Sequence, residues 1–421
     1  MFYQSTSLRF IKKFACIGPQ CEDMCCTDLK ILLQPQEVER LSQAAQTARP
    51  QDLDIQNGIV EKEGKKFLKF VQQGDRSYCA FLAKDKFCGL HSALGHNVLP
   101  KPCRTYPRAI SILGENLLLS GLPSCPEIAR LLLLAEDSCE IEHGRPIFSA
   151  ITEEMSVLTF QDRLSTHQRF FQVLNDKHIA VVKDSHDNYL RLFCLLSFTA
   201  DVVDKNIALF TSQDEQQWST VVDSIVDSKI WDQRISRITI PNRTKLFAIF
   251  LENVFITLAE TYKMKRFTTL FESVTSPYAK QDQLDIKSFQ SDFEHNLAWL
   301  WKHHKKDMQL WIRNYLLFAL FTKRFHQKSA DAVEFYRRLL VCFWLFHLMF
   351  VMHPHIHSAI EQQHLTDQIF QEKIVEVVQI ISRFLEHGSA IDYILQVLDA
   401  QQLNRLVGLL YLNIGLWRYS E

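Results

Sequence analysis

The stretch that decides this fold is Cys16-Ile17-Gly18-Pro19-Gln20-Cys21-Glu22-Asp23-Met24-Cys25-Cys26, because it places four cysteines close together and two of them side by side. Soft thiolates at short spacing suit zinc or an iron–sulfur cluster, both of which bind sulfur ligands tightly. The spacing therefore predicts a metal centre near the N-terminus. Five further cysteines precede residue 140 and only two follow it: Cys79, Cys88, Cys103, Cys125 and Cys139, then Cys194 and Cys342.

Two other interpretations of the cysteines fit less well. A secreted disulfide scaffold is normally short and follows a cleavable apolar segment, whereas residues 1–10 contain no such apolar core and the count of 11 cysteines is odd. Isolated thiols buried as small core residues explain Cys194 and Cys342. They do not explain the adjacent pair Cys25-Cys26.

Composition limits the class of protein. The chain has 421 residues, of which 47% are hydrophobic and 23% charged, with a formal net charge of −1. These values predict a soluble protein of two or three domains and give no global attraction to nucleic acid or phospholipid. The longest apolar run, Leu339–Met352, is shorter than the roughly 18–20 residues that span a bilayer. We expect a buried helix there, with a peripheral membrane contact or an oligomer contact as alternatives, and a cytoplasmic protein.

Glycine divides the chain into two halves. All 12 glycines lie at or before Gly144 or at or after Gly388. The long stretches between them repeat apolar residues at helical spacing, which predicts α-helices. We therefore expect a mainly α fold: a small cysteine-rich mixed α/β module at 1–145, followed by a large all-helical domain at 146–421. The clearest helical stretches are Ser165–Val182, Lys245–Tyr262, Phe293–Phe325, Asp331–Met352 and Leu365–Leu385.

Local signals in the first part predict short elements. Proline at Pro35 followed by acidic residues is typical of a helix start. Turn signals at Asn57-Gly58 and Glu63-Gly64 accompany β-like runs within Ile55–Val71. Another hairpin is indicated around Gly114-Glu115, between residues 108–113 and 116–120. Small modules of this kind commonly use a metal in place of a large core.

The ordered cysteine blocks resemble the flagellin lysine N-methylase family. They are Cys16 to Cys26, Tyr78-Cys79-Ala80-Phe81-Leu82 with Phe87-Cys88-Gly89-Leu90-His91, Leu99-Pro100-Lys101-Pro102-Cys103-Arg104-Thr105-Tyr106-Pro107-Arg108, and Ser124-Cys125-Pro126-Glu127-Ile128-Ala129-Arg130. The resemblance covers residues 14–130. It implies methyl transfer from S-adenosylmethionine to lysine ε-amines of flagellin, with the cysteine module chelating an iron–sulfur cluster, expected to be [4Fe-4S], or zinc.

A cubane cluster needs about four protein ligands, so the matching blocks hold more cysteines than one cluster can use. We rank Cys21, Cys25, Cys26 and Cys103 first, then Cys16, Cys79 and Cys88, with Cys125 and Cys139 behind. His91 is an alternative nitrogen ligand or a loop residue. The Cys-x3-Cys-x2-Cys spacing typical of radical S-adenosylmethionine enzymes fails here, because Asp28 stands at the third position.

The cofactor pocket and catalytic residues have no clear signal. No strand–glycine–helix arrangement of a Rossmann methyltransferase core is visible, so a different kind of site is expected. Arg104 and Arg108, on either side of Tyr106, could bind the cofactor carboxylate bidentately. They could equally pair with local acids, and Tyr106 could orient the substrate amine or simply pack. The basic aromatic stretch Trp299–Lys306 suggests a partner surface or a solvated helix face with two buried tryptophans.

Two non-methylase hypotheses stay open. One is a non-catalytic metal-binding interaction or redox-sensing protein, whose partner binding would change with oxidation. The other is an electron-transfer protein, which would show a reversible potential. Only the methylase hypothesis predicts transfer of labelled methyl groups to flagellin.

Overall fold

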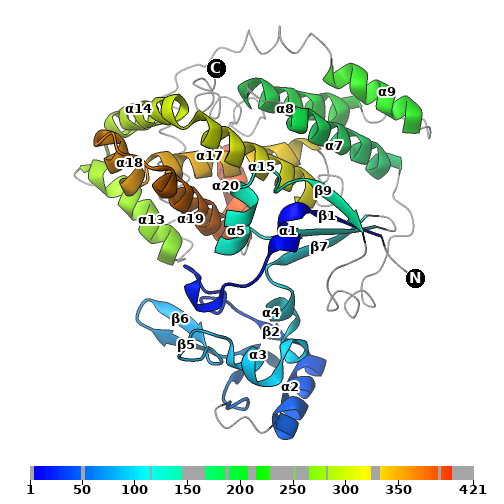
Figure 1. Ribbon diagram of the computed structural model, residues 1–421, viewed down its shortest axis with the longest axis vertical. Coiled ribbons are helices and arrows are strands. Elements are labelled where there is room, and N and C mark those ends of the chain that lie inside the picture. Colours follow the sequence, from blue (N-terminus) through cyan, green and yellow to red (C-terminus); the bar gives the residue numbers. More distant parts are fainter. Residues whose placement is uncertain are drawn as a thin grey trace.

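The computed structural model describes residues 4–48, 53–113, 116–144, 166–184, 189–206, 215–227, 251, 265–280, 283–323, 332–386 and 390–400. These residues form a large helical body and, beside it, a small module that carries most of the cysteines (Figure 1). Each part has its own hydrophobic core. The expected fold class, mainly α with a small mixed α/β part, is confirmed.

Short elements build the small module. Its helices and strands, in chain order, are η1 (Gly18–Gln20), β2 (Leu32–Leu33), α2 (Pro35–Ala48), β3 (Ile59–Lys62), β4 (Lys65–Leu68), β5 (Phe70–Gln73), β6 (Arg76–Cys79), α3 (Gly89–Leu94), η2 (His96–Val98) and α4 (Lys101–Thr105). Strands β2, β4 and β3 form one antiparallel sheet, and β5 and β6 form a hairpin. The core is small: Ile31, Leu33, Leu41, Ile55, Leu68, Cys79, Phe81, Leu90 and Leu99.

The turn predictions in this module have different outcomes. Glu63-Gly64 does join β3 to β4, with both residues at positive φ, as a two-residue hairpin turn requires. Asn57-Gly58 instead precedes β3, in a turn where Asp54 accepts the main-chain N–H of Asn57 at 3.0 Å. Glycine is required at Gly58 because a Cβ atom there would lie 2.1 Å from the ring of Phe81. The helix start predicted at Pro35 is confirmed by α2.

A four-stranded sheet joins the start of the chain to the helical body. It contains β1 (Gln4–Leu8), β7 (Arg108–Leu113), β8 (Asn116–Gly121) and β9 (Ile141–Gly144) in the order β7-β8-β1-β9. The predicted hairpin is confirmed by the antiparallel pairing of β7 with β8, while β1 pairs parallel to β8 and antiparallel to β9. Two short helices, α1 (Arg9–Lys13) and α5 (Pro126–Leu133), accompany this sheet.

The remaining described elements are almost all helices. They are α7 (Thr166–Asp184), α8 (Tyr189–Asn206), α9 (Glu215–Val226), α13 (Lys265–Thr275), α14 (Ile286–His303), α15 (Lys305–Lys323), α17 (Ala332–Val351), α18 (Pro354–Glu361), α19 (Asp367–Glu386) and α20 (Ala390–Ala400), with η6 (Ser276–Tyr278) and the short pair β10 (Ala279–Lys280) and β11 (Gln283–Leu284) between α13 and α14. Four of the predicted helical stretches are confirmed. The stretch 293–325 is split at His304 into α14 and α15, and 245–262 lies outside the described residues except for Leu251.

Helix α17 is the buried helix that the longest apolar run predicts. All of its residues from Leu339 to Val351 are buried, and Phe343, Phe346 and Phe350 have no exposed surface. No single helix among the described residues is long and apolar enough to cross a membrane. One bent pair, Val333–Val351 with Pro354–Glu361, meets the criterion by length and composition, as core helices also do.

The two hydrophobic cores do not separate the residues before 145 from those after it. Leu8, Phe10 and Ile11 near the N-terminus pack in the large core, together with Leu117–Leu119 of β8 and residues of α5. The smaller core draws only on residues 31–99. The boundary at 145 remains a prediction about domains, and the side-chain packing shows that the sheet and α5 share the core of the helical body.

Candidate metal centre

Three thiols meet where the N-terminal cysteine stretch reaches the small module. The thiol of Cys26 lies within hydrogen-bonding reach of both Cys25 and Cys88. This donor lowers the pKa of Cys25 to about 7 and that of Cys88 to about 6. The pKa of Cys26 is raised, because loss of its proton would end both hydrogen bonds and leave three adjacent thiolates. A metal ion or cluster could replace that shared proton, since metals bind the thiolate form.

Two further cysteines lie beside this trio. Cys79 ends β6, and its main-chain N–H donates to the carbonyl oxygen of Cys26 at 2.9 Å. The pKa of the Cys79 thiol is raised to about 11, mainly by burial and also by the charges of Cys88 and Cys25. The pKa of the Cys103 thiol in α4 is raised to about 12, mainly by desolvation of the thiol and also by the charges of Cys79, Cys88 and Cys25. The residue as a whole is exposed. The structure therefore brings five of the predicted ligands into one neighbourhood.

Main-chain N–H groups point at several of these sulfurs. The thiol of Cys79 receives such a hydrogen bond from Phe81, and that of Cys88 from Leu90 and His91 at the start of α3. Hydrogen bonds to sulfur favour the thiolate form and tune iron–sulfur potentials. His91 thus contributes its main-chain N–H to Cys88, within a helix rather than the loop that the sequence suggested.

The other cysteines lie around or away from this group. Cys21 and Cys125 are close enough to Cys25 to influence one another's pKa, and burial raises the pKa of both. Cys16 is exposed and lies near Arg108. Cys139 is buried in the large core, where its thiol donates to the carbonyl oxygen of Asn314 at 3.2 Å. The two isolated cysteines of the helical body are buried, as expected: Cys194 and Cys342.

The spacing of the sulfurs bears on the kind of metal. Among the described residues, which include all the cysteines, no three thiol sulfurs lie within 4.8 Å of one another. Tetrahedral zinc with bonds of about 2.3 Å would hold four sulfurs only about 3.8 Å apart. A cubane separates its cysteine sulfurs more widely, because each binds a different iron. Cys26, however, lies within hydrogen-bonding reach of both Cys25 and Cys88, so two of the sulfur pairs are about as close as those of a zinc site. Thiolate donors suit zinc as well as an iron–sulfur cluster.

A buried carboxylate supports the cysteine stretch. The side chain of Asp23 is fully buried, and it accepts hydrogen bonds or ion pairs from Arg76 at 3.0 Å, Arg266 at 3.0 Å and Arg383 at 2.8 Å. Burial favours the protonated form, but the arginines outweigh it, so the pKa of Asp23 is lowered. Sequence reasoning missed this role. Asp23 is visible within the cysteine stretch, whereas nothing marks Arg266 or Arg383 on their helices.

The two arginines that the sequence suggested for cofactor binding lie on different elements. Arg104 is buried in α4, where its main-chain oxygen lies 3.2 Å from Nε2 of His96. Arg108 begins β7 and lies over the ring of Phe14 at 5.2 Å, with its pKa lowered by burial. Tyr106, between them, packs against the large core and donates to Oγ of Ser124 at 3.5 Å. Their assignment to the cofactor remains a prediction.

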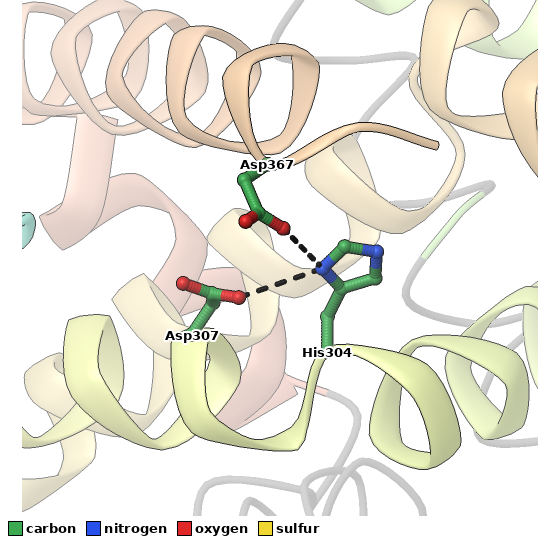
Figure 2. Close-up of side chains that lie close together, drawn as sticks. All are labelled: His304, Asp307 and Asp367. Carbon is green, nitrogen blue, oxygen red and sulfur yellow. Dashed lines mark hydrogen bonds and ion pairs between the residues drawn. The ribbon is translucent and has the colours of Figure 1, made fainter. Parts of the chain in front are cut away.

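A separate trio in the helical body has ligand types suited to a divalent cation. Nδ1 of His304 lies 3.4 Å from Oδ2 of Asp307 and 3.6 Å from Oδ1 of Asp367 (Figure 2). Both carboxylates belong to the first turns of helices, α15 and α19, where the helix dipole favours negative charge. Asp367 is also 80% exposed. We therefore interpret the trio as a structural contact between three helix ends: the C-terminus of α14 and the N-termini of α15 and α19.

The basic aromatic stretch belongs to the same region. Trp301 is buried and Trp299 half-buried, while Lys302, His303 and Lys306 are exposed. This arrangement agrees with a solvated helix face, but only Trp301 of the two tryptophans is buried. The partner-surface alternative stays untested.

Comparisons with known proteins point in one direction. The family model for the FliB lysine N-methylase C-terminal domain matches residues 181–412, more than half of the chain. The described residues of the matched region belong to the helical body, and the match does not include the cysteine blocks that carry the sequence resemblance. The chain is also 25% identical to a lysine-N-methylase of Salmonella choleraesuis (strain SC-B67) over 133 residues, which are 32% of this chain and 33% of that protein.

A second relative is shorter. The flagellar biosynthetic protein FliU of Salmonella muenchen is 26% identical over 134 residues, 32% of this chain and 79% of that protein. The alignment with the curated lysine-N-methylases spans only about a third of their length. No solved structure matches the chain.

Proposed function

Since the chain belongs to the FliB lysine N-methylase family, we propose that it is a protein-lysine N-methyltransferase that uses S-adenosylmethionine. The single observation that carries this proposal is the family match over residues 181–412. The names of the relatives agree with it, and the relation of one of them to flagellar biosynthesis supports flagellin as the protein whose lysines are modified.

The proposal includes an iron–sulfur cluster, expected to be [4Fe-4S], in the cysteine module. Its support is the gathering of Cys25, Cys26, Cys79, Cys88 and Cys103, together with N–H groups aimed at the sulfurs of Cys79 and Cys88. Zinc remains the alternative metal. Free thiols of this density are typical of a reducing compartment, so we place the protein in the cytoplasm.

The chemistry of the proposed reaction is a direct displacement. When bound, S-adenosylmethionine supplies an electrophilic methyl group on a sulfonium. The lone pair of a neutral lysine amine forms the new C–N bond as the C–S bond breaks, and the product amine loses one proton to solvent or a base. The protein has to desolvate the amine and hold it about 3 Å from the methyl carbon. Arg104 and Arg108 are the residues we propose for the cofactor carboxylate.

One experiment tests activity and metal together. The protein is purified without oxygen, its iron, sulfide and zinc are measured, and the same sample is incubated with flagellin and S-adenosylmethionine carrying a labelled methyl group. Iron with equal sulfide, and label on flagellin lysines, support both parts of the proposal. Iron without methyl transfer to flagellin or to other lysine-rich proteins would contradict the methylase and favour a redox-sensing or electron-transfer protein. Zinc without sulfide would contradict the cluster.

A further inference from the structure

The segment Cys21–Thr27 lies between the small module and the helical body and touches both. On the module side, the carbonyl oxygen of Cys26 accepts from the N–H of Cys79 at 2.9 Å. Thr27 forms a β-bridge with Tyr78, and its hydroxyl accepts from Arg76 at 2.6 Å. These bonds join the segment to β6, the strand that carries one of the proposed ligands.

On the opposite side, helix α19 of the body holds the same segment. The guanidinium of Arg383 donates to Oδ2 of Asp23 at 2.8 Å and to the carbonyl oxygen of Thr27 at 2.6 Å. The amide of Gln379 donates to Oδ2 of Asp23 at 2.9 Å and to the carbonyl oxygen of Ser124 at 3.0 Å. Two adjacent turns of α19 thus bind the segment from Cys21 to Thr27 and the residue preceding Cys125.

The charges at this contact are unequal. Three guanidinium groups share the single carboxylate of Asp23. Arg76 also forms an ion pair with Asp28 at 2.9 Å, and Arg266 forms a second ion pair with Glu376 at 4.0 Å. Arg383 has no second carboxylate within ion-pair distance in the part of the chain that the structure describes, and its side chain is only 8% exposed. Because buried cations in proteins are paired with anions, further negative charge is expected beside Arg383.

Metal-bound thiolates would supply that charge. Cys25 lies two residues from Asp23 and close enough to Arg383 for the two charges to interact. A cluster held by four cysteine thiolates carries net negative charge. The positive charge of Arg383 on α19 would therefore be balanced when the cysteines of the module hold a metal.

We propose that Arg383 is a positioning residue that couples the metal centre to the helical body. It orders the segment Cys21–Thr27 through Asp23 and Thr27 and balances the negative charge of the bound metal–thiolate group. Metal binding and the docking of this segment on α19 therefore stabilise each other, as linkage requires when a ligand binds only one of two states. The inference rests on the metal centre proposed above and not on the methylase activity.

The first test uses the unaltered chain. Hydrogen–deuterium exchange is measured on anaerobically reconstituted protein and on the same protein after removal of iron with a chelator. The proposal predicts faster exchange, by about tenfold or more, not only in residues 21–28 but also in α19 around residues 379–386. Helix α9, which packs against α7 and α8 in the helical body, serves as the internal reference. Unchanged exchange in α19 after complete iron removal would overturn the proposal.

Matched variants test the residue itself. Arg383→Gln removes the charge and the paired hydrogen bonds, and we expect iron to be lost to a chelator about tenfold faster or more. Arg383→Lys keeps the charge without the planar fork, so retention should be intermediate. Arg338→Gln is the control, because Arg338 lies on α17 and pairs with Glu334 and Asp392 of the helical body, not with residues of the small module. Iron release at the wild-type rate from Arg383→Gln would contradict the role of Arg383.

Failure of this inference is distinguishable from failure of the proposed function. A protein that binds iron and methylates flagellin but shows no coupling keeps its function and loses the inference. A protein that binds no metal loses the metal centre and, with it, this inference. Methyl-transfer assays do not enter the test, because exchange and iron release are measured without substrate.

Discussion

The small module and the helical body are held together by different means. The helical body has a continuous core in which Trp311, Tyr315, Phe343 and Phe346 contact one another with ring centroids 4.7–6.3 Å apart. The small module buries only a handful of apolar side chains, yet five cysteines converge within it or at its edge. A core of that size gives little stability by itself. The comparison indicates that the body folds by burial of apolar surface, whereas the module has too small a core to rely on burial alone and would gain stability from the metal centre proposed above.

The largest effect should come from removing the shared thiol. Cys26→Ala eliminates the hydrogen bonds to Cys25 and Cys88 and one proposed ligand. We expect metal content to fall by at least about tenfold and the module to become protease-sensitive, while the helical circular dichroism is largely retained. Cys342→Ala, in the body, should keep the metal. Full metal content in Cys26→Ala would remove Cys26 from the ligand set.

A core substitution should affect the other part. Phe343→Ala deletes a fully buried ring on α17 and should destabilise the body by about 3–5 kcal/mol. Metal bound per folded molecule should not change. Thermal and denaturant unfolding measure the first quantity, and iron analysis of the folded fraction measures the second. Phe87→Ala is the control, because Phe87 is 47% exposed. Equal destabilisation by both variants would contradict the assignment of the core.

Acid should weaken the body through its buried histidines. His178 is fully buried, bonded to Tyr336 at 2.6 Å and Thr199 at 2.8 Å, and burial lowers its pKa to about 3. In the unfolded chain the pKa is about 6.5, so between these values the unfolded state binds more protons and stability falls as pH decreases. The expected slope is about 1.4 kcal/mol per pH unit for this residue.

Denaturant unfolding between pH 6.5 and 5 measures that slope. His178→Gln should be less stable at neutral pH but less sensitive to acid over this range. Burial also lowers the pKa of His347, to about 4, so some acid sensitivity remains in the variant. Equal slopes for the variant and the unaltered chain would show that His178 titrates normally.

The smallest effect is expected where a charge pair lies at the surface. Asp367→Asn removes the more exposed carboxylate beside His304, and exposed pairs contribute roughly 0.5 kcal/mol or less. The melting temperature should therefore change little, with or without added Mn²⁺. A clear stabilisation of the unaltered chain by Mn²⁺ that is lost in Asp367→Asn would instead identify the trio as a cation site.

The sequence predicted those features that depend on local pattern. Helical periodicity located α17 and α19, and the turn residues Glu63-Gly64 located a hairpin. Cysteine spacing predicted a shared site, and Cys25, Cys26, Cys79, Cys88 and Cys103 do gather, with Cys21 close to Cys25. The order of the ligands stays a prediction, because proximity along the chain says little about proximity after folding. The parallel pairing of β1 with β8 joins residues more than a hundred positions apart. Arg383 and Gln379 resemble ordinary polar positions of an amphipathic helix, so their contacts with Asp23 were not predictable.

The stacking of Arg108 on Phe14 has a consequence for how this chain could have been assembled. These two residues mark the points where the backbone leaves α1 and enters β7, and they touch, although more than ninety residues separate them. The described residues between them leave the sheet after α1 and return to it at β7. Such a segment could be inserted, deleted or replaced as a unit without changing the order of the strands in the sheet. Joining Lys13 to Arg108 by a short linker would yield a chain in which the sheet and the helices persist without the seven cysteines from Cys16 to Cys103.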